Sequence, residues 1–275
     1  MVPLSPKVLC HKVIHTLIAL TLACAAASLW TRRLTWSCPW EVAPTLGIAL
    51  YSAGAVLTAP LATTFTGRAL HAVTGIWHLD DYLGHLCYLW AAGAIVFAAL
   101  SRLIDDDGIL RASIRRLELP VLLVVTAMLV ALAMSDTNNG YYPDMYDVPV
   151  DTWLAVYWLL INGMLMSLFT YAARQLLILR QDERSRRTAN MFILGSVCGF
   201  LSCVAGLANA LMPQLDAMSA DAVVWFLSCA SGVSFIGGAA YSWRTKMRPF
   251  RKLQRGVRTT RRELRRRDGP TPAAH

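Results

Sequence analysis

The chain has little charge and lacks the usual sequence signatures of an enzyme. Charged residues make up 16% of its 275 residues. It contains no P-loop and no G-x-G-x-x-G, G-x-S-x-G or H-E-x-x-H motif. Its seven cysteines form no C-x-x-C pair, and most lie in apolar segments, where a free cysteine packs as a small side chain. We therefore expect no catalytic residues, no metal, no cofactor and no disulfide framework.

Long apolar segments take up most of the chain. Apolar residues make up 56% of it, and seven segments approach the roughly 20 residues that a helix needs to cross a bilayer. The predicted fold class is all-α, a polytopic membrane helix bundle of seven transmembrane helices without room for a separate soluble domain. The segments, none of which contains Lys or Arg, are residues 13–30, 42–62, 83–101, 117–134, 152–173, 191–212 and 222–243.

The first segment leaves a second interpretation open. Lys7 and Lys12 precede it and the small residues 23–27 lie near its end, as in a cleaved signal. Cleavage there would place Arg32 and Arg33 outside, against the charge pattern of the rest of the chain. The alternative is a six-span chain whose first segment is re-entrant or lies on the membrane surface.

The basic residues are distributed very unevenly between the two sides of this arrangement. With the N-terminus outside, 3 of the 26 Lys and Arg fall outside and 23 fall inside. Short cytoplasmic loops of membrane proteins carry such an excess of Lys and Arg. The predicted topology therefore has the N-terminus outside and the C-terminus in the cytoplasm.

The basic residues are densest after the last segment. They divide the chain into a transmembrane domain, residues 1–243, and a basic cytoplasmic tail, residues 244–275. We expect an amphipathic tail helix on anionic lipid, followed by a disordered end. Nucleic acid or a cytosolic protein is the less favoured partner. The apolar residues with helical spacing in the tail are Met247, Phe250, Leu253 and Val257.

Small residues at regular spacing mark the last two segments. Small residues, glycine among them, that recur every four residues allow helix backbones to approach closely. We expect these two segments to pack against each other, and homodimerisation is the less favoured use of the same faces. The glycines are Gly195, Gly199 and Gly206 in the sixth segment and Gly232 and Gly238 in the seventh.

Few polar side chains lie deep inside the segments. An ionisable group in hydrocarbon is costly and is for that reason usually functional. No segment has a central Asp, Glu, Lys or Arg, which argues against a proton-coupled carrier or a voltage sensor built on a buried charge. His85, Asn162 and Asn209 remain as the candidate lining of a polar cavity.

Ionisable residues also gather at the outer end of the third segment. If a helix begins by Trp77, then His78, Asp81 and His85 share one face of it, and Asp81 can hydrogen-bond His85. We take His78 and Asp81 as a candidate outer site, because such a group can hold Zn²⁺ or relay a proton. The favoured interpretation is simpler: carboxylates at this position cap the helix N-terminus.

The longest outer connection, residues 135–151, is acidic and rich in tyrosine. Three of its aromatic side chains stand among four aspartates and can contact a cationic partner or a sugar. A solvated loop with interfacial tyrosines is the favoured interpretation.

Residues 70–85 contain Thr74-Gly75 after a short amphipathic turn, and His85 opens a segment. This stretch resembles a family of uncharacterised seven-helix integral membrane proteins from actinobacteria and their phages. The long outer loop, the arginine-rich connection after the fifth segment and the small-residue sixth segment extend the resemblance over roughly residues 15–245. It implies a multi-pass protein of the bacterial cytoplasmic membrane. Members of the family are labelled transporters, which implies no substrate.

Two functions remain from different classes. The first is a small-molecule transporter or permease-like module with a cavity around His85, Asn162 and Asn209. No inverted repeat and no pair of interrupted helices supports it in the sequence. The second is a non-transporting sensor or interaction protein that displays the 135–151 loop outside and a basic face inside. A continuous polar cavity at mid-membrane favours the first.

Overall fold

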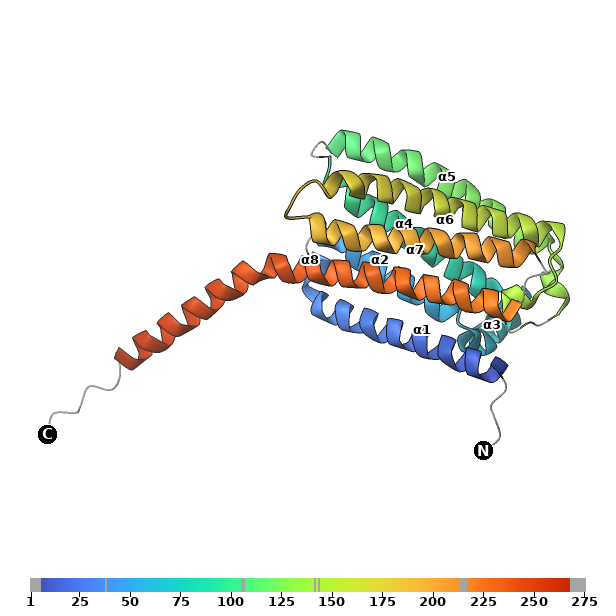
Figure 1. Cartoon of the computed structure of the whole chain (residues 1–275), viewed down its shortest axis with the longest axis horizontal. Helices are drawn as coiled ribbons and strands as arrows, with labels where there is room; N and C mark the ends of the chain where they lie inside the picture. The colour runs from blue at the N-terminus through green and yellow to red at the C-terminus, as the bar shows by residue number, and fades with distance from the viewer. Residues whose placement is uncertain are drawn as a thin grey trace, which may run out of the picture.

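The computed structural model describes residues 6–267 apart from 38, 105–106, 141, 143 and 213–216, and this part of the chain contains helices and no strand. The helices lie side by side in a bundle (Figure 1). They are α1 (Pro6–Thr31), η1 (Arg33–Ser37), α2 (Pro39–Leu57), α3 (Pro60–Thr74), α4 (Leu79–Leu100), α5 (Asp107–Met134), η2 (Asp136–Asn139), η3 (Met145–Asp147), α6 (Thr152–Leu179), α7 (Arg186–Leu211) and α8 (Ala217–Arg267).

Within these described residues, six helices are long and apolar enough to cross a membrane: α1, α4, α5, α6, α7 and α8. The corresponding apolar stretch of α2, Glu41–Leu57, is shorter. Large apolar side chains such as Leu123 and Leu159 are exposed on the outside of the bundle, where a soluble protein would place charge. The chain is therefore a helical, multi-pass membrane protein.

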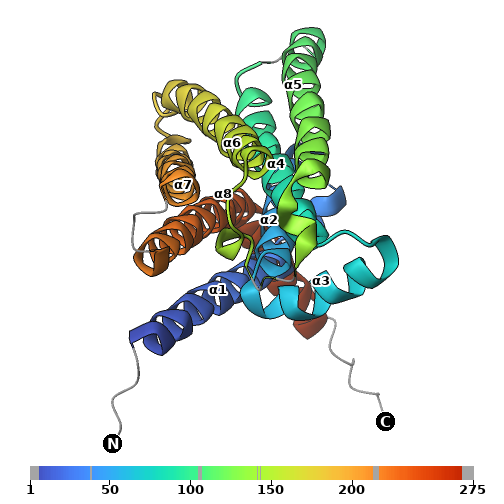
Figure 2. The same cartoon turned by 90° about the vertical axis from the view of Figure 1, so that its right-hand side faces the viewer.

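The prediction that residues 42–62 form one continuous helix is wrong. α2 ends at Leu57, Ala59 is extended and Pro60 begins α3. Proline has no N–H to continue the preceding helix, and its fixed φ suits the first turn of a new one. α3 then lies across the end of the bundle instead of along it (Figure 2).

Neighbours in the bundle include both consecutive helices and helices far apart in the chain. α7 packs most extensively on α8, α2 on α4 and α6 on α7, and α1 covers α8 (Figures 1 and 2). The expected contact between the last two apolar segments is the α7–α8 pair. We call the end that carries His78, Asp144 and Asp151 the loop end, and the opposite end, with Arg32 and Glu41, the tail end.

α8 runs without interruption across the expected boundary between residues 243 and 244, and its C-terminal part extends beyond the other helices (Figure 1). The side chains of Phe250, Leu253 and Val257, on which the amphipathic prediction rests, lie outside the described residues. The interaction of the tail with lipid therefore stays a prediction.

A buried ion pair joins three helices at the tail end. Arg32 is 0% exposed, and its Nη2 donates to Glu41 Oε2 at 2.9 Å. Its Nε donates to Thr45 Oγ1 at 3.1 Å and its Nη1 to the Ala239 carbonyl at 2.6 Å. Lys246 of α8 donates to the other oxygen of Glu41. Arg32, which the sequence suggested only as a topology charge, thus connects α1 with α2 and α8.

Replacing Glu41 by Gln should destabilise the bundle by roughly 3–5 kcal/mol, because the buried Arg32 guanidinium would lose its counter-charge. The measurement is chemical unfolding of the purified protein in detergent. Glu183→Gln makes the same chemical change at an exposed position of the α6–α7 connection and should have almost no effect. Equal effects of the two substitutions would show that the ion pair does not hold this end together.

Candidate functional site

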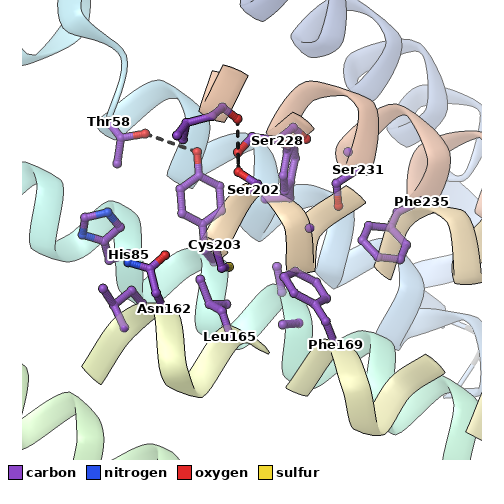
Figure 3. A pocket seen from close by; sticks show the side chains of 18 of the residues that line it. Thr58, His85, Asn162, Leu165, Phe169, Ser202, Cys203, Ser228, Ser231 and Phe235 are labelled. Carbon is purple, nitrogen blue, oxygen red and sulfur yellow. Dashed lines mark hydrogen bonds between the residues drawn. The ribbon is translucent and has the colours of Figure 1, made fainter. Parts of the chain in front are cut away.

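A narrow cavity of about 130 Å³ lies among α2, α4, α6, α7 and α8 (Figure 3). Its lining runs from Pro44 of α2 to Thr58 just after that helix, and on α8 from Val224 to Ala239. At 1.5 Å per helical residue, either stretch corresponds to about 20 Å along the bundle. Most of the lining is apolar or aromatic. A cavity of this shape and composition is suited to a small, largely apolar molecule.

Two of the three predicted cavity residues line this space. His85 and Asn162 face it from α4 and α6 (Figure 3). Nδ1 of His85 lies 2.7 Å from the Tyr157 hydroxyl, and the Asn162 amide donates to the Trp158 carbonyl at 2.9 Å. Asn209 is not part of the lining.

Asn209 instead joins α7 to α8 near the loop end. Its amide donates to Asp221 Oδ1 at 2.6 Å. This contact satisfies the amide side chain locally, so Asn209 has a structural use that the sequence did not indicate.

The predicted outer group is divided between two environments. α4 begins at Leu79 and not by Trp77, because His78 is in the left-handed conformation with φ 59°. Nδ1 of His78 lies 2.9 Å from Asp81 Oδ2. The Asp81–His85 hydrogen bond that a regular helix would permit is absent from the described contacts, in which His85 pairs with Tyr157 instead. Asp81 lines the cavity and His78 does not.

Zinc was the other possibility for this group. In the part of the chain that the structure describes, no three His, Cys, Asp or Glu side chains converge to hold a metal ion. His78 and Asp81 thus form a hydrogen-bonded pair, and His85 is bonded to Tyr157 instead.

α3 closes over the start of α4 beside this pair. Thr66 donates to Asp80 Oδ2 at 3.4 Å, and a Cβ on Gly67 would stand 3.0 Å from the same oxygen. Asp80 is 1% exposed. Glycine at position 67 therefore lets α3 approach the Asp80 carboxylate closely.

The 135–151 loop turns partly inward, unlike the solvated loop that we expected. Met145 is 1% exposed, and the Tyr146 ring stacks on Trp158 with centroids 4.4 Å apart. Asp151 anchors the loop, because its carboxylate accepts from Leu154 N and Asp136 N. Asp144, Met145 and Tyr146 line the cavity and form its roof at the loop end. Tyr141 lies outside the described residues.

Burial changes the ionisation of the roof. It raises the pKa of Asp144 to about 7, helped by the nearby carboxylates of Asp81 and Asp221. Burial also lowers the pKa of the neighbouring His78 imidazole, although Asp80 and Asp144 act in the opposite direction. Near neutral pH the Asp144 carboxyl group therefore changes between its protonated and its ionised form, and the His78 imidazole is mostly neutral.

Hydroxyl donors in the cavity wall are directed mostly at backbone carbonyls. Tyr51 donates to the Ser228 carbonyl at 2.7 Å and Ser231 to the Gly195 carbonyl at 2.8 Å. Tyr88 and Thr58 share a hydrogen bond of 3.2 Å (Figure 3). These contacts connect α2 with α4 and α8, and α7 with α8.

At the five predicted packing glycines, the atoms nearest to an added Cβ belong to side chains, mostly aromatic rings, and not to the backbone of a neighbouring helix. A Cβ on Gly195 would lie 2.8 Å from Phe235, and one on Gly238 would lie 2.8 Å from Phe192. These two reciprocal contacts lie between α7 and α8. The remaining rings come from other segments: Phe169 of α6 lies against Gly199, Tyr146 against Gly206 and Tyr51 of α2 against Gly232.

Sequence reasoning missed the aromatic wall of the cavity. Tyr51, Tyr88, Trp158 and Phe169 lie in apolar segments, where an aromatic residue is usual and gives no separate signal. An aromatic ring that packs against a glycine could be recognised in the sequence only if the two residues were already known to lie against each other.

Comparison with known proteins gives no family: no protein-family model, curated protein or solved structure matches the chain.

Gly232→Ala should lower the stability of the detergent-solubilised protein by about 1–3 kcal/mol, as overpacking does. The new Cβ would overlap the Tyr51 ring, which its hydrogen bond to the Ser228 carbonyl holds in place. Thermal unfolding measures the change. Gly163→Ala on α6, where no described atom lies within 4 Å of the new Cβ, should be neutral or stabilising. A tolerated Gly232→Ala would mean that Tyr51 is free to move.

Proposed function

We propose that the protein binds a small molecule in the central cavity and carries it across the bacterial cytoplasmic membrane, as a permease-like module. The observation that carries the proposal is the long cavity among five helices, with His85 and Asn162 in its wall. Its lining is mostly apolar, so it is not the continuous polar cavity expected of a transporter, and the support comes from its length and from these two polar groups. Apolar pockets with a few convergent polar groups are the usual form of small-molecule sites. The resemblance to seven-helix proteins labelled transporters points the same way.

The proposal includes seven membrane crossings, with the loop end outside and the tail end in the cytoplasm. Besides the six long apolar helices, α2 is the additional span. Its apolar stretch is short, and a local thinning of the bilayer accommodates it. α1 begins and α8 leaves the bundle at opposite ends, as an odd number of crossings requires (Figure 1). The excess of Lys and Arg at the tail end supports the orientation.

Passage through the protein requires the two ends to open in turn. The Asp144–Tyr146 segment lines the cavity at the loop end. At the tail end, Ala239 lines the cavity and its carbonyl accepts from Arg32, so the buried ion pair lies beside the cavity floor. We propose that the loop end and the tail end open alternately.

The alternative, a sensor that displays the outer loop, draws less support. Met145 and Tyr146 pack into the bundle and are unavailable to a partner at the surface. A partner would have to bind the remaining, more polar part of the loop.

The native Cys203 allows a test without a known substrate, because it lines the cavity. A variant that keeps only Cys203 is reconstituted in vesicles and treated from either side with two membrane-impermeant methanethiosulfonates, one cationic and one anionic. Transport predicts modification by at least one reagent from each side, since both ends open to water. The matched control keeps only Cys198 of α7, which is outside the cavity lining and should react from neither side. Protection of Cys203 from both reagents on both sides would contradict the proposal.

A further inference from the structure

The described residues that line the cavity include two carboxylates, Asp81 and Asp144, and no Lys or Arg. Both carboxylates are at the loop end, where Asp81 is 4% exposed. Two acidic groups in a space of low polarity are costly unless a positive charge or protons compensate them. The electrostatics of the cavity therefore favour a cation and disfavour an anion.

The described part of the chain supplies little compensation. His78 is the basic group bonded to Asp81, at 2.9 Å, and burial lowers the pKa of its imidazole. Among the described contacts, Asp144 accepts a hydrogen bond from Tyr146 N at 3.0 Å, a neutral donor. A ligand that brings a positive charge would replace the proton that Asp144 otherwise takes up.

The polar groups in the wall favour the same ligand. The hydroxyls of Tyr51 and Ser231 and one N–H of the Asn162 amide are directed at backbone carbonyls. Their oxygens then remain as acceptors, which suit a donor or a cation better than a carboxylate or phosphate. The wall is thus rich in acceptors.

Aromatic rings near the two carboxylates indicate what kind of cation fits. Trp158 stacks on Tyr146 at 4.4 Å, and Tyr51 and Tyr88 lie 5.5 Å apart further along the cavity. The faces of such rings attract organic cations, quaternary ammonium groups above all, and their apolar surface accepts alkyl or aryl substituents. The described residues offer no convergent set of three metal-binding side chains that would suit a divalent ion instead.

We propose that the cavity binds a small monovalent organic cation, an amine or quaternary ammonium compound, with its charge held by Asp81 and Asp144 and its apolar part against Tyr146, Trp158 and the rings beyond. This inference rests on the proposed function, because it names the class of molecule that the same cavity takes. The roof segment supplies one carboxylate and one ring, so binding also holds the roof closed.

The test compares three probes of one shape: choline, its neutral isostere 3,3-dimethylbutan-1-ol, and the anion 3,3-dimethylbutyrate. Binding to the full chain in maltoside detergent is measured by titration calorimetry, without choline lipids. Choline should bind at least about tenfold more tightly than the alcohol, the ratio that one modest charge interaction gives. The anion should not bind.

Variants locate the site. Asp144→Asn should lower choline affinity about tenfold and leave the affinity for the alcohol unchanged, because the amide can still accept from Tyr146 N. Asp147→Asn, at an exposed position of the same loop, should bind choline as the natural chain does. Tyr146→Phe keeps the ring and should retain binding, whereas Tyr146→Leu should weaken it.

The outcomes separate the two proposals. Equal affinity for choline and the alcohol, or preference for the anion, would overturn the inference about charge while the cavity keeps its role in binding. Absence of binding by all three probes, with Cys203 still reached by reagents, would overturn the cation class alone. Protection of Cys203 from every reagent on both sides would contradict the proposed transport function itself. Unaltered choline affinity in Asp144→Asn would place any cation site elsewhere.

Discussion

The lack of water in the hydrocarbon of a bilayer is the constraint on which this structure depends. A polar group in that environment must find its partner within the protein, which is why helices span it and charges collect at the ends. The chain follows this rule along most of its length. Its hydroxyl side chains return to carbonyls one turn earlier, as Thr21 does with Leu17, or reach across to a neighbouring helix, as Ser231 does with Gly195.

The two ends of the bundle solve the problem of buried charge differently. At the tail end, Glu41 is flanked by Arg32 and Lys246, so opposite charges meet. At the loop end, Asp81 and Asp144 stand near each other with one imidazole beside them. The first arrangement is complete in itself and stabilises the packing of α1, α2 and α8. The second becomes complete when a proton or a cation is added, which is why we propose a cationic ligand there.

The long apolar helices could be predicted from the sequence because hydropathy largely determines them. The break at Pro60 was also visible in principle, since proline stops one helix and starts another. The partners of buried side chains could not be predicted. Arg32 finds the Ala239 carbonyl across the bundle, and no local pattern connects residues that are so far apart in the chain.

The candidate site was predictable in the same partial way. His85 and Asn162 stood out as polar residues in apolar segments, and both line the cavity. The hydrogen bond expected between Asp81 and His85 assumed a helix that was already regular at Trp77. The left-handed backbone at His78 ends that regularity, so the pairing shifts to His78–Asp81 and His85–Tyr157. The roof residues Asp144 and Tyr146 come from a loop whose inward turn depends on the Asp151 anchor and on the space beside Trp158.

The central claim is that the acidic loop end faces outward and the basic tail end faces the cytoplasm, across a bundle of seven spans. Site-directed labelling of single cysteines in intact cells tests it most directly, with Asp147→Cys and Glu183→Cys introduced separately into a chain without its native cysteines. Both positions are exposed, one at each end. The account predicts that an impermeant maleimide labels position 147 in intact cells and position 183 only after permeabilisation. Labelling of both positions from the same side, or the reverse pattern, would contradict it.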